Sequence, residues 1–302
     1  MVTRVVFVLA PGVHLLDVAG PAQALSMVAD RGGPAYQPIY VADSPTVLSY
    51  QGLPLVTRTD WPELDPADLV VVPGWRVCAP GPRLPIGDPL LERVAAHHRQ
   101  GGEVMSVCSG AFALGRAGLL DGRRCTTHHD LQDELARRYP RAHVRRDLLF
   151  TSDSGLHTSA GIASGIDLAL HLIVERHGAA TAAQVARGMV VYTRRNGDQP
   201  QASVMLRHRD HLDDVVHRAQ DLIDEKYAEP LPLPELAGTV GVSERTLTRA
   251  FTRTLGITPL RYQQQLRVER AELLIGSGSA VESAARSVGF EDARMLRRLR
   301  SR

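Results

Sequence analysis

The chain has 302 residues, enough for two domains of ordinary size. Its 44% hydrophobic and 23% charged residues exclude a disordered protein. The net charge of only +2 excludes a uniformly basic coat for nucleic acid. No apolar run reaches the length of a membrane span, and the first is too short for a signal peptide, so we expect a cytoplasmic protein with reduced thiols.

Basic residues gather towards the C-terminal end. Residues 241–302 hold twelve Arg and six Asp plus Glu, a net charge of +6. Because the whole chain carries +2, the remaining residues carry −4. This asymmetry predicts that one end of the protein faces a nucleic acid.

Apolar strands alternate with helices through residues 1–191. The pattern predicts a doubly wound, mostly parallel sheet of the flavodoxin-like kind, an α/β fold whose binding site lies at the carboxyl ends of the strands. Strands are expected at 5–10, 38–42, 47–56, 68–73, 103–107, 148–151 and 156–159. Helices are expected at 21–29, 88–100, with Asp88 as its cap, 110–120, 162–176 and 182–191.

A cysteine stands where one strand turns directly into a helix. Residues 106–110 read SVCSG, which is typical of a nucleophile elbow, a strained turn that needs small neighbours. The helix N-terminus is expected to favour the thiolate of Cys108. The alternative is an inert buried cysteine, the usual state of a free thiol. Cys78 and Cys125 lack this context, and we interpret them as structural.

Three further positions at strand ends carry polar groups. Asp17, in the loop after the first strand, can hydrogen-bond the Cys108 sulfur, and the loop at Gly74 can bring backbone N–H groups to an anion. His128 ends a polar segment that is predicted to face the same pocket, although a lone histidine is more often a core residue. No His or Cys pair has the spacing of a zinc site, so neither a metal nor a cofactor is expected.

Residues 5–191 resemble the PfpI branch of the class I glutamine amidotransferase-like superfamily. Four motifs carry the resemblance: LLDVAGP at 15–21, DLVVVPG at 68–74, SVCSGAFALGRAGLLDGRRCTTH at 106–128 and TSAGIASGIDLALHL at 158–172. In that family an acid from the first loop lies beside the elbow cysteine, and Asp17 and Cys108 match these two positions. The resemblance implies a ligand site formed by Asp17, Gly74, Cys108, Ser109 and His128.

The sequence also departs from the hydrolases of this superfamily. Ser109 stands where the proteases carry a histidine, Ser106 replaces the usual elbow glycine, and Trp75 follows Gly74 where a second glycine is usual. Isonitrile hydratases of the same superfamily nevertheless use a Cys/Asp pair with a hydroxyl residue after the cysteine. Whether Cys108 is catalytic therefore stays open, and non-enzymatic use of the site is the favoured interpretation.

Residues 192–208 are polar and contain Gly and Pro, which places a linker there before a helical domain at 209–302. Within that domain an amphipathic helix is expected from Leu212 to Tyr227 and another from about Pro234. Gly241 then provides a turn, and Ser243 is expected to cap a helix whose apolar stripe recurs every four residues from Leu247. This pattern is typical of a helix-turn-helix; the alternative is a helical hairpin with a solvated basic face.

A second, shorter copy of this unit follows a long helix that starts at Thr258-Pro259. Its parts are residues 281–288, Gly289-Phe290 and residues 292–300. A rigid connecting helix can place two recognition helices roughly 34 Å apart, one turn of DNA. The order GITP…Y…R…AxLL…A…GF resembles the AraC/XylS family, and the two domains in this order resemble GlxA-type transcriptional regulators.

This resemblance implies which side chains contact DNA. They are Arg245, Thr248 and Arg249 in the first unit and Arg294, Met295 and Arg298 in the second. Arg253, on the basic side of the first of these helices, is a further candidate for DNA contact. Arg300 stands where the family has an aromatic core residue, and the chain ends about one helix short of the family pattern. We therefore expect the second unit to be truncated or weakened, and the first to read most of the sequence.

The favoured interpretation is a transcriptional regulator that binds double-stranded DNA, with an α/β domain that senses a small-molecule effector or forms a homodimer. The alternative is a cysteine-dependent hydrolase or isonitrile-hydratase-like enzyme with a regulatory tail. A bare interaction module is the third hypothesis.

Overall fold

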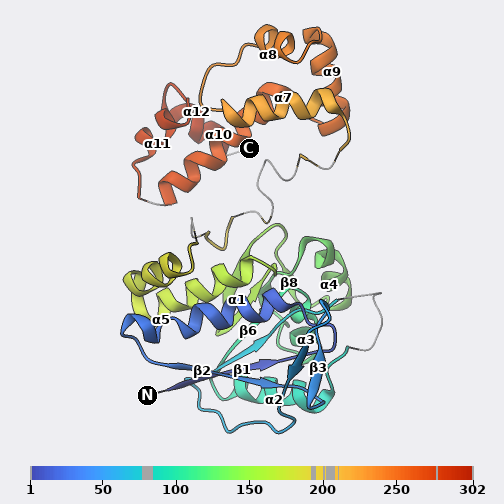
Figure 1. Cartoon of the computed structure of the whole chain (residues 1–302), viewed down its shortest axis with the longest axis vertical. Helices are drawn as coiled ribbons and strands as arrows, with labels where there is room; N and C mark the ends of the chain where they lie inside the picture. The colour runs from blue at the N-terminus through green and yellow to red at the C-terminus, as the bar shows by residue number, and fades with distance from the viewer. Residues whose placement is uncertain are drawn as a thin grey trace. The chain divides into compact units, whose positions relative to one another are not determined.

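The computed structural model describes residues 2–76, 84–191, 195–199, 201, 208–209, 211–276 and 278–300 (Figure 1). The chain divides into two compact units, Met1–Gln201 and Ala202–Arg302. Within the described ranges no helix has the length and apolar character needed to cross a membrane. Cys78 lies outside these ranges, as does most of the predicted linker.

The first unit contains a six-stranded sheet in the order β2-β1-β5-β6-β10-β9. Neighbouring strands run parallel except at the edge, where β9 pairs antiparallel with β10. The strands are β1 (Thr3–Val8), β2 (Tyr36–Val41), β5 (Leu69–Val72), β6 (Glu103–Val107), β9 (Phe150–Asp153) and β10 (Leu156–Ser159). The predicted mostly parallel α/β fold is confirmed.

Helices cover both faces of this sheet (Figure 1). On β1, Val5 and Phe7 enter the core under α1 (Leu15–Ser26) and α5 (Ser164–Gly188). Val6 and Val8 face the opposite way, into the core under α2 (Asp88–Arg99) and α3 (Ala111–Arg116). Alternate side chains of one strand therefore fill two cores, which is why the strand reads as a continuous apolar run.

Short elements complete the first unit. They are the hairpin β3 (Thr46–Leu48) and β4 (Pro54–Val56), the pair β7 (Arg124–Cys125) and β8 (His143–Val144), α4 (Gln132–Arg138), and the 3-10 turns η1 (Ala29–Arg31), η2 (Cys108–Gly110) and η3 (His129–Leu131). The stretch predicted as strand at 47–56 is this hairpin. The described residues 195–199 are bonded to the same unit: Gly197 accepts a hydrogen bond from the backbone N of Leu149 (3.1 Å).

Several helix boundaries differ from the prediction. Helix α1 begins at Leu15 rather than near Pro21, so Asp17 lies in its first turn and not in the preceding loop. Pro21 is tolerated inside the helix, where it removes one backbone hydrogen bond. The cap of α2 is Gly87, one residue before Asp88. Helix α3 ends at Arg116, followed closely by Gly118, whose φ of +73° is left-handed.

The second unit is helical. Its elements are α7 (Asp214–Glu225), α8 (Leu233–Thr239), α9 (Glu244–Leu255), α10 (Pro259–Gly276), α11 (Val281–Ser287) and α12 (Ala293–Arg300). Helices α8 and α9 form one helix-turn-helix, α11 and α12 form another, and α10 contributes side chains to both of their cores. The two predicted units are confirmed. Leu212, however, is fully exposed, and α7 begins only after Asp213, which caps it by accepting a hydrogen bond from Val216 N (3.2 Å).

Candidate functional site: the cysteine elbow and the recognition helix

The turn after β6 has the predicted elbow geometry. Cys108 has a φ of +55°, a left-handed conformation that costs a non-glycine residue about 1–3 kcal/mol. The chain turns so sharply that a Cβ on Gly110 would lie 2.0 Å from the carbonyl oxygen of Val72. Only glycine fits there, and Cys108 is held at the carboxyl end of β6 in the interior of the domain.

Two glycines from other parts of the chain, Gly74 and Gly161, lie very close to Cys108. A Cβ on Gly74 would lie 2.7 Å from the Cβ of Cys108, and a Cβ on Gly161 would lie 2.2 Å from it. Gly161 also has a φ of +96°, which favours glycine independently. The backbone therefore approaches the cysteine closely on two sides, and only 6% of Cys108 is exposed.

The backbone N–H groups after β5 are already used within the protein. Gly74 N donates to Oδ2 of Asp17 (3.2 Å), and Trp75 N donates to Oγ of Ser109 (2.8 Å). The Ser109 hydroxyl in turn donates to Trp75 O (2.8 Å). Asp17 and Ser109 therefore occupy the two N–H groups of Gly74 and Trp75, so these two groups are not available to a bound anion.

Asp17 is completely buried beside the elbow. Its Oδ1 accepts a hydrogen bond from Ile162 N (2.8 Å), while Oδ2 is bonded by Gly74 N. Burial raises the pKa of Asp17 to about 6, although both backbone hydrogen bonds act in the opposite direction. A Cβ on Gly74 would lie 2.6 Å from Asp17 Oδ2 and 2.7 Å from the Cβ of Cys108, so the predicted acid and cysteine lie together.

The start of the helix acts on Cys108 in the predicted direction, because the hydrogen bond from Ser109 N lowers the pKa of the thiol, but burial outweighs this effect. Burial raises the pKa of this thiol to about 12, and the nearby Asp17 charge raises it further, while a hydrogen bond from Ser109 N lowers it. Desolvation outweighs the helix because the turn is buried and only a 3-10 turn and a six-residue helix follow it. A thiol with a pKa this high carries its proton at neutral pH.

The neighbouring residue Thr127 places His128 next to the Cys108 elbow. Thr127 Oγ1 donates to the carbonyl oxygen of Cys108 (2.7 Å), which ties the segment after β7 to the elbow. His128 is half-buried, and burial lowers its pKa. Together with His129 and Asp130 it forms a group whose potential metal-ligand atoms lie within 4.8 Å of one another, although His129 and Asp130 are exposed.

The structure thus brings Asp17, Gly74, Cys108 and Ser109 into one cluster, with His128 at its side. Thr127 belongs to the polar segment that was predicted to face the pocket, whereas two contributors, Gly161 and Ile162, were not predicted. Gly161 and Ile162 follow β10, a parallel strand, and so stand at the edge of the sheet where a site is expected. That position in the chain was the signal that could have identified them.

The first helix-turn-helix has the predicted local structure. Gly241 has a φ of +76°, and Ser243 Oγ accepts a hydrogen bond from Thr246 N (3.2 Å) at the start of α9. Leu247 and Phe251 are fully buried in the core formed with α7 and α8. These contacts fix the apolar side of α9 and leave its basic side facing outwards.

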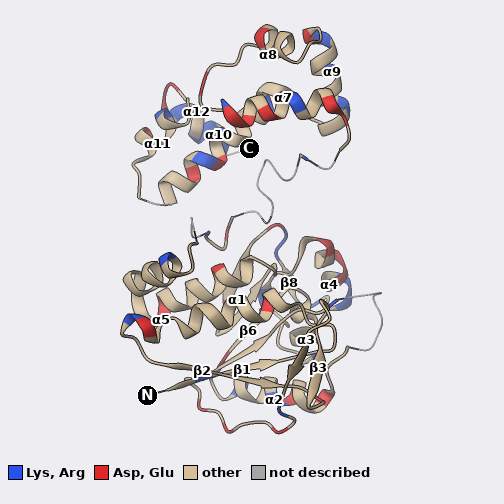
Figure 2. Ribbon diagram, viewed as in Figure 1, with Lys and Arg blue, Asp and Glu red and all other residues tan. Residues whose placement is uncertain are grey.

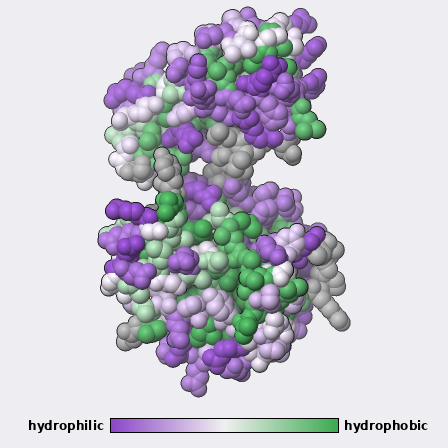
Figure 3. All heavy atoms as spheres, viewed as in Figure 1, coloured by the Kyte–Doolittle hydropathy of each residue, from purple (hydrophilic) through white to green (hydrophobic). Residues whose placement is uncertain are grey.

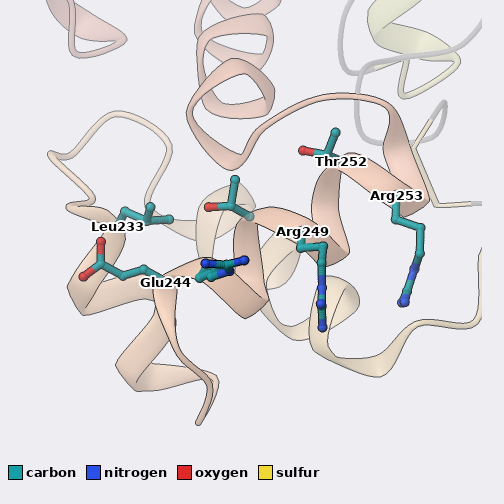
Figure 4. A pocket seen from close by; sticks show the side chains of 7 residues that line it. Leu233, Glu244, Arg249, Thr252 and Arg253 are labelled. Carbon is teal, nitrogen blue, oxygen red and sulfur yellow. The ribbon is translucent and has the colours of Figure 1, made fainter.

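The outward side of α9 borders a hollow of about 730 Å³ (Figure 4). It is lined by Leu233, Glu244, Arg245, Thr248, Arg249, Thr252 and Arg253. In the part of the chain that the structure describes, no carboxylate lies within ion-pair distance of Arg245 or Arg249. Arg249 and Arg253 extend in the same direction in Figure 4, but Arg253 is bonded to Asp213 (2.9 Å), at the cap of α7. The least constrained cations are therefore Arg245 and Arg249.

The second recognition helix, α12, is also basic (Figure 2). Arg294 and Arg298 are exposed, while Leu296 is fully buried and Met295 is half-buried beneath Arg298, whose Nη2 lies 2.8 Å from the Met295 sulfur. Arg300, at the position where an aromatic residue was expected, lies 3.3 Å from a carboxylate oxygen of Glu272 on α10. The helix packs through Leu296 and keeps its basic side outwards.

The fold and the two sites define a class of two-domain proteins. In this class an α/β domain with a strained cysteine elbow is followed by a pair of helix-turn-helix units. The model of the DJ-1/PfpI family matches residues 3–175, more than half of the sequence, and the chain belongs to this family. A helix-turn-helix domain model matches residues 236–302. The resemblance to regulators that join a PfpI-like domain to an AraC-type domain is thereby confirmed.

Known proteins are similar to this chain over different spans. The transcriptional regulator GbdR of Pseudomonas aeruginosa is 35% identical over 201 residues, covering 65% of this chain and 53% of GbdR. The regulator CdhR of the same species is 29% identical over 290 residues, or 94% of this chain and 84% of CdhR. Isonitrile hydratase of Pseudomonas putida is 34% identical over 185 residues, covering 60% and 75%.

Among solved structures, an AraC family transcriptional regulator from Pseudomonas putida has a TM-score of 0.52 at 27% identity, covering 62% of this chain and 99% of that one. The match to GbdR, in contrast, spans only about half of that relative's length.

Proposed function

We propose that this protein is a transcriptional regulator that binds double-stranded DNA sequence-specifically through α9. The observation that carries the proposal is the capped, basic α9, which packs through a buried apolar stripe and presents Arg245 and Arg249 on its outward side. Among the described residues, no carboxylate lies within ion-pair distance of these two arginines. Guanidinium groups bind phosphate and make bidentate contacts to guanine, so they supply both affinity and base discrimination. Arg253, Arg294 and Arg298 add positive charge, with Thr248 beside the first pair.

The α/β unit is proposed to sense a small molecule. Asp17, Gly74, Cys108, Ser109 and His128 would form the ligand site, with the neutral thiol as a contact rather than a nucleophile. The proposed domains are residues 1–191 for sensing and 209–302 for DNA binding, joined by residues 192–208, of which 195–199 are bonded to the first unit. CdhR, a named transcriptional regulator, is similar along nearly the whole chain, which supports this combination.

A homodimer formed through the α/β unit is part of the proposal. Apolar side chains are visible on the surface of this unit in Figure 3, and Leu16 and Ile162 are 42% and 38% exposed next to Asp17 and Gly161. Exposed apolar groups of this kind favour association with another protein surface. A dimer would double the number of DNA contacts and make the operator symmetric.

Binding-site selection tests the proposed function. The purified full chain is incubated with random duplexes, and bound DNA is amplified and sequenced over several rounds. We expect one enriched motif, and its symmetry would reveal whether the protein binds as a dimer. Equal enrichment of unrelated sequences at physiological salt would contradict sequence-specific binding.

One observation favours an enzyme as the second candidate. Cys108 and Asp17 both lie against the position that a Cβ on Gly74 would occupy, and isonitrile hydratase is among the relatives. Hydration of an isonitrile by the full chain would support this candidate if Cys108→Ser abolished the turnover and Cys125→Ser did not. Turnover at the rate of the buffer alone would contradict it.

A further inference from the structure

Arg267 on α10 directs its guanidinium into the protein. Its Nε donates to Tyr227 O (2.6 Å), its Nη2 to Glu229 O (2.8 Å) and its Nη1 to Gly289 O (2.7 Å). Tyr227 and Glu229 belong to the connection between α7 and α8, whereas Gly289 lies in the turn between α11 and α12. A single side chain therefore bonds the backbone of the segment that leads into the first helix-turn-helix and the backbone of the turn within the second.

Other contacts reinforce the same region. We call this region the joint and define it as residues 227–229, Gln263, Arg267 and residues 289–290. Gln263 Nε2 donates to the carbonyl oxygens of Tyr227 (3.0 Å) and Glu229 (2.9 Å). Gly289 has a φ of +86°, and a Cβ on it would lie 2.0 Å from Ala228 O, so the two turns are in backbone contact. The Arg267 guanidinium carbon lies 5.7 Å from the centre of the Phe290 ring.

The hydrophobic cores meet at the joint as well. Tyr227 packs against the core that contains Phe251 and Tyr262 and also against the core that contains Phe290 and Leu296. The two units are thus held together by direct packing and hydrogen bonds in addition to the continuous helix α10. A helix alone can bend and twist, and the joint opposes that motion.

The chemistry of arginine suits this place. Its planar guanidinium carries five donors in a fixed fork, so it can bond three carbonyls that point in different directions, which a lysine ammonium cannot match in geometry. Removing the guanidinium would take the donor from the half-buried Gly289 carbonyl and leave the carbonyls of Tyr227 and Glu229 with only their hydrogen bonds from Gln263. A buried carbonyl is costly to leave unpaired.

We infer that Arg267 is a positioning residue that fixes the separation and angle of α9 and α12, so that the protein accepts only one spacing between the two parts of its DNA site. This inference rests on the proposed function, because spacing has meaning only if both helices contact DNA. On this inference the second helix-turn-helix unit helps to set the spacing that the DNA site must have, independently of how many bases that unit contacts.

DNA binding by Arg267→Met provides the first test. The full chain is titrated with the selected site, with the same site carrying one inserted base pair between its two parts, and with a site whose second part is scrambled. We expect Arg267→Met to bind the intact site about tenfold more weakly than the wild type does. The inserted base pair should reduce the affinity of the variant much less than it reduces the affinity of the wild type. Both proteins should bind the scrambled site with the same affinity. Arg218→Met, which removes an exposed arginine from α7, should behave as wild type in all three titrations.

Two results would overturn the inference: an unchanged penalty for the inserted base pair, or equal weakening on the intact and scrambled sites, since the latter indicates a general loss of folding. Circular dichroism checks folding. If Arg267→Met is unfolded, Arg267→Lys takes its place, with the same changes expected at a smaller size because the lysine keeps the charge but loses the fork.

A measurement without DNA separates this inference from the proposed function. Spin labels on non-native amino acids at Thr239 of α8 and Ser283 of α11, both exposed, report the distance between the two units in the full chain. We expect one narrow distance distribution in the wild-type background and a broader one with Arg267→Met. Equal widths would refute the joint. A broadened distribution together with failed site selection would keep the joint and refute the DNA-binding proposal.

Discussion

The buried carboxyl group of Asp17 predicts an unusual dependence of stability on pH. Its pKa is raised from 3.8 to about 6 in the folded protein, chiefly by burial. A folded-state pKa above the unfolded value means that the folded protein binds the proton more tightly. The stabilisation is therefore complete below pH 3.8 and is lost as the pH rises through about 6.

The magnitude follows from the difference between the two pKa values. A change from 3.8 to about 6 corresponds to roughly 3 kcal/mol, most of it lost between pH 4 and 6. In Asp17→Asn this titration is absent. We expect the free energy of unfolding of the wild type, relative to that of Asp17→Asn, to fall by roughly 3 kcal/mol between pH 3 and 7. The absolute stability of the variant also reflects its lost backbone hydrogen bond, but that loss does not depend on pH.

Urea denaturation followed by tryptophan fluorescence measures this difference. Trp61 and Trp75 are the two tryptophans of the chain, and both belong to the first unit, so the signal reports that unit. Asp88→Asn serves as a control with the opposite sign, because Arg116 lowers the pKa of exposed Asp88. A wild-type minus Asp17→Asn difference that stays constant from pH 3 to 7 would refute the assigned environment of Asp17.

Three further predictions concern the elbow and the recognition helix. With its pKa raised to about 12, Cys108 should react with iodoacetamide at pH 7 far more slowly than a free cysteine and about as slowly as the buried Cys125. Peptide mapping by mass spectrometry measures the labelling of both residues. Rapid, selective labelling of Cys108 would contradict the argument that burial raises its pKa. Gly161→Ala places a Cβ 2.2 Å from the Cβ of Cys108 at a φ of +96°, so it should lower the free energy of unfolding of the first unit by more than about 1 kcal/mol in the same urea assay. The control Gly52→Ala has open space around its Cβ at a φ of +86°, so its loss of unfolding free energy should be smaller. Ser243→Ala removes the cap of α9 and should lower the stability of the second unit by about 1 kcal/mol, measured by circular dichroism, whereas an unchanged melting curve would show that the cap contributes nothing.

Much of the fold was predictable because it depends on local patterns. The run at 103–107 is a strand with the predicted bounds, and the helix capped by Ser243 begins as expected. Apolar periodicity and glycine turns need no knowledge of distant residues. The start of α1 was missed because Pro21 suggested a helix start, while packing of α1 against α5 and β2 extends the helix to Leu15.

The chemistry at the elbow was harder to predict, because it depends on which groups are buried together. The position of Cys108 follows from the sequence, but its pKa depends on desolvation and on Asp17, and both come from the folded core. Likewise, nothing local indicates that Asp17 and Ser109 occupy the N–H groups of Gly74 and Trp75. Arg253 was predicted to contact DNA, yet its ion pair with Asp213 depends on the docking of α9 against α7.

The central claim is that α9 reads DNA sequence through Arg249. It is tested most directly by the ratio of dissociation constants for a scrambled duplex and the selected site, measured by fluorescence anisotropy at fixed salt. Arg249→Ala should weaken binding to the selected site by roughly 1–3 kcal/mol while changing the scrambled duplex much less, so the ratio falls. Arg218→Ala on α7 is the matched control and should leave the ratio unchanged. An unchanged ratio for Arg249→Ala would contradict the assignment of α9 as the reading helix.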